Sequence, residues 1–75
     1  MERYKNTRGD SGVRAYEMGL GFIRVQFTKG DVYLYTYDSA GHDNIEQMKV
    51  LALKGNGLNG FINTTARKLY ARKER

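Results

Sequence analysis

Residues 22–37 read Phe22-Ile23-Arg24-Val25-Gln26-Phe27-Thr28-Lys29-Gly30-Asp31-Val32-Tyr33-Leu34-Tyr35-Thr36-Tyr37. Apolar and polar side chains alternate in the first six residues, and the last six are rich in β-branched and aromatic side chains. Both patterns are typical of β-strands. Because a glycine lies in the short polar stretch between them, the segment predicts an antiparallel hairpin.

The turn of this hairpin decides which side chains are buried, because a shift of one residue exchanges the two faces of a strand. A two-residue turn needs a positive φ at Lys29, whereas a turn with a bulge asks this only of Gly30. The bulged form is favoured; it pairs Val25 with Tyr33 and directs Tyr33 and Tyr35 into the core. The outer face then carries Arg24, Gln26, Val32, Leu34 and Thr36. The tighter form stays open as an alternative, and it would display an Arg and Tyr surface suited to stacked bases.

Regular structure is also expected on both sides of the hairpin. A short strand is predicted from Val13 until the glycines at 19 and 21 interrupt it. After a loop over residues 38–43, Asp43 or Asn44 can cap an amphipathic helix that ends before Gly55. Its apolar face is made of Ile45, Met48, Leu51 and Ala52. This helix is expected to cover the apolar face of the sheet, which would not be stable alone.

The last twenty residues begin with Gly55-Asn56-Gly57-Leu58-Asn59-Gly60, which matches the G-x-G-x-x-G pattern of dinucleotide sites. That motif functions between a strand and a helix, whereas here a helix precedes it, so a helix-to-helix turn is the better interpretation. One or two helical turns are expected over residues 58–63. Residues 66–71 favour a further helix capped by Thr64 or Thr65, with a terminal strand as the alternative.

These elements predict a small α+β domain with an antiparallel sheet of two or three strands and two or three short helices on one face. With 75 residues the chain has room for one core. Residues 1–10 lack an apolar rhythm and are expected to be a flexible lead-in to a single domain over residues 11–75.

Composition excludes several kinds of chemistry. There is no cysteine, so disulfides and thiol catalysis are excluded, and the apolar runs are too short to span a bilayer. The first residues show no apolar secretory segment, and a cytoplasmic location is expected. His42 is the only histidine, and Asp38, Ser39 and Asp43 beside it form no recognisable triad or metal pattern. We therefore expect neither an enzyme nor a bound metal or cofactor.

Positive charge is concentrated at the C-terminal end. The formal net charge is +5, and residues 64–75 hold five cationic side chains against Glu74 alone. The cations are Arg67, Lys68, Arg72, Lys73 and Arg75. Such a cluster attracts phosphates, although basic ends that only improve solubility are also common.

The sequence resembles the KTSC domain family. The likeness rests on the order of Ser11-x-Val13, Ile23-x-Val25-x-Phe27, Gly30, the Tyr33-Leu34-Tyr35 centre, a helix, and Phe61-x-Asn63 followed by a basic residue and Tyr70. It covers about residues 11–70. The family is named for a C-terminal extension of some lysyl-tRNA synthetases and also occurs as a small bacterial or phage protein. A Val-Pro pair that often follows the second strand in the family is absent here.

The resemblance implies a role in RNA binding, with Tyr33 and Tyr35 corresponding to the central tyrosines of the family. Together with the charge it predicts a non-catalytic binding module for RNA or another nucleic acid. Arg67, Lys68, Arg72 and Lys73 are the expected phosphate contacts, with Arg24 and Tyr37 as secondary contacts. The alternative is a protein-interaction module, with a homodimer as one form of it, that uses the sheet edge or an exposed apolar patch at Phe22, Val32 and Leu34. The sequence does not identify the partner or the oligomeric state.

Overall fold

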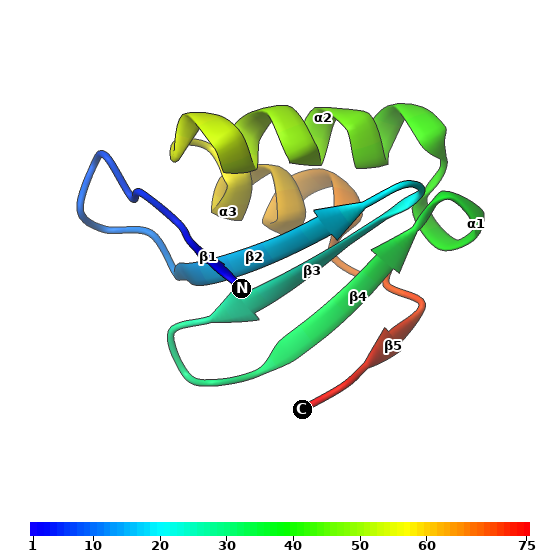
Figure 1. Cartoon of the computed structure of the whole chain (residues 1–75), viewed down its shortest axis with the longest axis horizontal. Coiled ribbons are helices and arrows are strands. Elements are labelled where there is room, and N and C mark those ends of the chain that lie inside the picture. Colours follow the sequence, from blue (N-terminus) through cyan, green and yellow to red (C-terminus); the bar gives the residue numbers. More distant parts are fainter.

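Five antiparallel strands form one open sheet in the order in which they occur in the chain (Figure 1). The computed structural model describes all residues, 1–75. The strands are β1 (Glu2–Arg3), β2 (Val13–Gly19), β3 (Phe22–Phe27), β4 (Val32–Thr36) and β5 (Arg72–Lys73). The α+β class is confirmed, but the expected number of two or three strands is too low. The two edge strands, β1 and β5, have two residues each. Strands this short cannot show the alternation of apolar and polar side chains from which a strand is predicted.

All the helical segments lie on one face of the sheet (Figure 1). They are α1 (Tyr37–Ala40), α2 (His42–Lys54), α3 (Leu58–Phe61) and the π-helical turn η1 (Ile62–Ala66). Helix α2 covers β3 and β4 as expected and ends at Gly55, whose φ is 74°. The Gly55–Gly60 motif joins α2 to α3, as the helix-to-helix interpretation requires.

The expected N-cap of the long helix, Asp43 or Asn44, lies two or three residues beyond the observed one. Helix α2 begins at His42, and Gly41 at its N-cap provides no side-chain hydrogen bond. The reciprocal capping pair lies one element earlier, where the Thr36 side chain accepts a hydrogen bond from the Ser39 amide and the Ser39 hydroxyl accepts one from Thr36 N–H. The predicted loop over residues 38–43 is therefore largely helical, because it holds most of α1 and the first residues of α2.

The bulged hairpin register is confirmed. Val25 lies opposite Tyr33 and Ile23 opposite Tyr35, and Gly30 has a φ of 100°. Gly30 N–H donates to the Phe27 carbonyl over 2.8 Å. The tyrosines therefore lie on the side of the sheet that the helices cover, and the alternative with an open Arg and Tyr surface is excluded.

A β-bulge in β2 changes which of its residues enter the core. Val13 pairs with Phe27 but Ala15 pairs with Gln26, so Arg14 is an extra residue on this strand. Beyond the bulge Tyr16 lies opposite Val25 and is 8% exposed. The bulge thus brings Tyr16 to the helix side and leaves Ala15 on the open face.

The core lies between the sheet and the helices. Its largest fully buried side chains are Tyr35, Ile23, Ile45, Met48, Leu58, Val13 and Val25. Tyr4 joins this core at 3% exposure, and its hydroxyl accepts a hydrogen bond from Leu58 N–H over 3.2 Å. The segment 1–10, expected to be flexible, thus contains a strand and a core residue.

The C-terminal segment does not form the helix favoured for residues 66–71. Helical structure ends at Ala66, and β5 pairs with β4 at Leu34–Arg72 and Tyr33–Lys73. The terminal strand, which was the alternative, is present but begins six residues after Ala66. No helix in the structure has the length and apolar character that crossing a bilayer would need.

Candidate functional site

A cleft of about 620 Å³ opens on the helix side of the sheet, where the β3–β4 turn approaches the segment between η1 and β5. Aromatic and cationic side chains dominate its walls. The lining residues on the hairpin side are Phe27, Thr28, Lys29, Asp31, Tyr33 and Tyr35. On the other side they are Gly12, Ile62, Asn63, Arg67, Lys68 and Tyr70. We call this the aromatic cleft.

Three tyrosines and a phenylalanine pack edge to face along the cleft. The ring centres of Tyr33 and Tyr70 lie 4.8 Å apart, those of Phe27 and Tyr33 5.8 Å, and those of Tyr35 and Tyr70 6.4 Å. Tyr35 is 1% exposed at the base, Tyr33 is partly buried, and Tyr70 is 39% exposed. Tyr70 is therefore the ring of this set that offers the most apolar surface to a ligand.

Cations surround these rings. Lys29, Arg67 and Lys68 are exposed, line the cleft and form no ion pair with any acid of the protein. Lys73 stands 6.0 Å from the centre of the Tyr33 ring and 3.8 Å from Asp31, the one acid of the cleft wall. The cleft therefore keeps a clear positive excess.

Burial of Tyr35, reinforced by the neighbouring Tyr33 and Tyr70, raises the pKa of its hydroxyl to about 12. The group is therefore neutral at physiological pH and can donate a hydrogen bond at the base of the cleft. Rings, a neutral donor and unpaired cations suit a planar ligand that carries negative charge.

The structure brings together only part of the expected nucleic-acid site. Arg67 and Lys68 lie with Tyr33 and Tyr35 in the aromatic cleft, and Lys73 lies beside it. Sequence reasoning did not assign Lys29 and Tyr70 to a site. Lys29 occupies the hairpin turn, which could have marked it as exposed, whereas Tyr70 had been placed on a helix that does not form.

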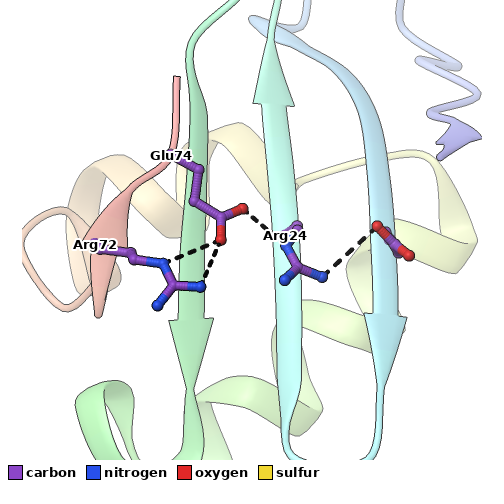
Figure 2. Close-up of polar contacts among 4 residues, drawn as sticks. Arg24, Arg72 and Glu74 are labelled. Atoms are coloured by element: carbon purple, nitrogen blue, oxygen red, sulfur yellow. Dashed lines mark hydrogen bonds and ion pairs between the residues drawn. The ribbon is translucent and has the colours of Figure 1, made fainter.

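Arg24 and Arg72 are on the opposite, open face, and both are engaged by acids (Figure 2). Arg24 Nε lies 2.8 Å from Glu74 and its Nη1 lies 3.7 Å from Glu17, while Arg72 Nη2 lies 3.0 Å from Glu74. These two arginines, first Arg24 and then Arg72, hold the pKa of the Glu74 carboxyl below its usual range. Their charges are balanced within the protein, so they do not extend the cleft.

The expected apolar patch on the outer face is not present. Val32 and Leu34 are 6% and 8% exposed, because the Arg24–Glu74 pair spans β4 above them. Phe22 is partly buried, with the Arg24 guanidinium 5.1 Å from its ring centre. Long charged side chains thus cover the apolar surface with their aliphatic stems.

Tyr37 lies in α1, which follows the end of β4 remote from the hairpin turn, and takes no part in the cleft. Its hydroxyl donates to Glu46 over 2.7 Å, and Lys49 Nζ lies 3.1 Å from the same carboxylate. This hydrogen bond raises the pKa of Tyr37 and lowers the pKa of Glu46. Lys49 also lowers the pKa of Glu46. The His42 ring packs on Tyr37 with centres 4.8 Å apart.

No group of three His, Asp or Glu side chains is placed to hold a metal ion. His42 is exposed, and its one ion-pair partner is the exposed Asp43, with Nδ1 3.3 Å from the carboxylate. The ring nitrogens of His42 make no other side-chain hydrogen bond, so no nucleophile is held beside it.

Comparisons of the chain with protein-family models, with curated proteins and with solved structures found no match.

Proposed function

We propose that the protein is a non-catalytic module that binds single-stranded RNA through the aromatic cleft. The observation that carries the proposal is that the exposed Tyr70 ring, packed on Tyr33, lies in the same cleft as Arg67 and Lys68, two cations without an acidic partner. Single-stranded nucleic acids are bound by this combination, because every base has a face that stacks and every nucleotide carries a phosphate.

Each part of the cleft has a role in this proposal. A base stacks against Tyr70, the most exposed ring, next to Tyr33. The phosphates on either side of this base meet Arg67 and Lys68 on one wall and Lys29 on the other. The cleft volume of about 620 Å³ lies within the range of about 300–1,000 Å³ that is usual for ligand sites.

Two further arguments support RNA as the ligand. The resemblance to the KTSC family implies it, and the central tyrosines of that resemblance, Tyr33 and Tyr35, both line the cleft. The net charge of +5 would also draw a polyanion toward the protein. The proposal places the protein in the cytoplasm.

Fluorescence anisotropy with a labelled single-stranded RNA, recorded at several salt concentrations, tests the proposal. Replacing Tyr70 by Leu should weaken binding by about 1–3 kcal/mol, the usual contribution of one stacked base, whereas Tyr70→Phe keeps the ring and should bind like wild type. The double variant Arg67→Gln/Lys68→Gln should reduce the slope of log K against log salt by about 1.4, since each phosphate contact on a single strand contributes about 0.7.

Lys54→Gln is the matched control for charge, because Lys54 is exposed at the end of α2, outside the cleft and without an ion pair. If Lys54→Gln weakens binding as much as a substitution of Arg67 or Lys68, the attraction is nonspecific. If the Tyr70→Leu variant binds RNA with the affinity of wild type, Tyr70 does not stack on a base. The proposal is wrong if wild type shows no detectable binding, or if its affinity does not depend on salt concentration. A protein partner that survives nuclease and high salt would favour the protein-interaction alternative instead.

A further inference from the structure

The open face of the sheet carries a second cationic hollow, separate from the aromatic cleft. Its volume is about 690 Å³, and no carboxylate side chain lines it. The lining residues are Met1, Arg3, Arg14, Ala15, Gln26, Val32 and Arg75. Three arginines thus share the lining with Gln26 and two small apolar residues. We call this the arginine hollow.

The three arginines of the hollow differ from the other two on the same face. Arg24 and Arg72 are neutralised by Glu17 and Glu74, whereas Arg3, Arg14 and Arg75 are exposed and have no ion pair. Concentrating like charges around one depression costs electrostatic energy unless an anion binds there. The contrast indicates a site for a negative ligand rather than a surface of general solubility.

Backbone pairing brings these three arginines to one hollow. The β-bulge of β2 adds Arg14 beside Ala15, and Tyr4 N–H donates to the Arg14 carbonyl over 2.9 Å. Arg3 lies opposite Ala15 on β1, and Val32 and Arg75 exchange main-chain hydrogen bonds of 3.3 Å. Bulges often redirect a side chain toward a functional site, and this one brings a cation to the hollow.

The hollow and the aromatic cleft lie back to back at the same end of the sheet. Gln26 and Val32 line the hollow, while their chain neighbours Phe27 and Asp31 line the cleft. Consecutive residues of a strand point to opposite faces, so only the thickness of the sheet separates the two sites. A chain bound in the cleft can reach the hollow by passing around the end of the hairpin or the edge at β5.

We propose that the arginine hollow binds phosphates of the same RNA strand whose base occupies the aromatic cleft. This extension rests on the proposed function. Guanidinium groups suit the task because their planar forks match phosphate oxygens in a bidentate geometry. The strand thus wraps around one end of the sheet, and the base-stacking site and the hollow hold successive parts of it.

Anisotropy with two single-stranded RNAs, of roughly four and roughly twelve nucleotides, tests this extension, since these lengths lie within usual site sizes. The short RNA fills only the cleft, and the Arg3→Gln/Arg14→Gln variant should bind it within about twofold of wild type. The long RNA also reaches the hollow. The same variant should bind it on the order of tenfold more weakly near 0.1 M salt, with a salt slope reduced by about 1.4.

Arg8→Gln is the matched control, because Arg8 is an exposed arginine without an ion pair that lies outside the hollow. The extension is overturned if Arg8→Gln weakens binding of the long RNA as much as the double variant does. It is also overturned if the double variant binds the long RNA as tightly as wild type. In both cases retained binding of the short RNA leaves the proposed function intact. Failure of wild type to bind either RNA overturns the proposed function and the extension together.

Discussion

Arg24 on β3 and Glu74 beyond β5 meet at 2.8 Å above the outer surface of β4, although 50 positions separate them in the sequence (Figure 2). The pair covers Leu34, and the same carboxylate binds Arg72. Glu74 thus joins the C-terminal strand to the middle of the sheet and pairs with two of the cations that the sequence had assigned to a ligand.

Glu74→Gln should lower the free energy of unfolding at neutral pH, because it removes the shared acceptor of Arg24 and Arg72. The folded-state pKa of Glu74 is lowered, so its contribution is present above the ordinary glutamate pKa and is lost as the pH falls through the folded value. Denaturant unfolding of the variant and of wild type at pH 7 and near pH 2 measures this contribution. The difference in unfolding free energy between the two proteins should vanish near pH 2, which is well below the ordinary glutamate pKa of about 4.3. Glu2→Gln, at an exposed acid without an ion pair, should have little effect at either pH.

Tyr35→Phe should make the protein less sensitive to alkali. The pKa of Tyr35 is raised to about 12 in the folded state from an ordinary value of 10.0. The contribution of the protonated Tyr35 hydroxyl to the free energy of unfolding is therefore complete below pH 10.0, and it is lost as the pH rises toward about 12. Denaturant unfolding on both sides of this window should show wild type losing about 2–3 kcal/mol more than the variant. Parallel losses in the two proteins would contradict a buried, protonated Tyr35.

Tyr4→Phe should destabilise the fold by about 1–3 kcal/mol, because it leaves the Leu58 N–H without an acceptor in the core. Hydrogen exchange of the Leu58 amide should also become faster. Tyr70→Phe is the control, since the Tyr70 ring is 39% exposed and its hydroxyl makes no hydrogen bond within the protein. An unchanged stability of Tyr4→Phe would mean that residues 1–10 do not dock as described.

Two glycine substitutions should act in opposite directions. Gly30 has a φ of 100°, and Gly60 lies within α3 without a positive φ, while a Cβ at either position would meet nothing within 4 Å. Gly30→Ala should therefore cost about 1–2 kcal/mol of backbone strain, and Gly60→Ala should stabilise by about 0.5–1 kcal/mol. Thermal unfolding of both variants checks the signs. A neutral Gly30→Ala would argue against the bulged turn.

Local patterns predicted the centre of the fold. The position of Gly30 was enough to favour the correct hairpin register, because only one turn places the positive φ on glycine. Helix α2 followed from the spacing of Ile45, Met48 and Ala52, all of which are buried. These features depend on neighbours in the chain, so a single sequence contains the necessary information.

Features that depend on distant partners could not be predicted. The bulge at Arg14 brings Tyr16 into the core only because β2 pairs with β3, and no residue near Arg14 signals it. The ends of the chain have no apolar period, yet Tyr4 is held by Leu58 and β5 by β4. Counting charges along the sequence located the cations Arg67 and Lys68. It could not show that Arg72 forms an ion pair with Glu74, because that pair depends on the fold of the C-terminal segment.

The arrangement of Tyr33, Tyr35 and Tyr70 gives the protein an optical probe of its own. The chain has no tryptophan and six tyrosines, so half of its fluorophores surround the aromatic cleft. Ring centres only 4.8 to 6.4 Å apart allow excitation to pass between them before emission. Quenching of one ring by an occupant would therefore dim its neighbours too, and occupancy can be followed in unlabelled protein.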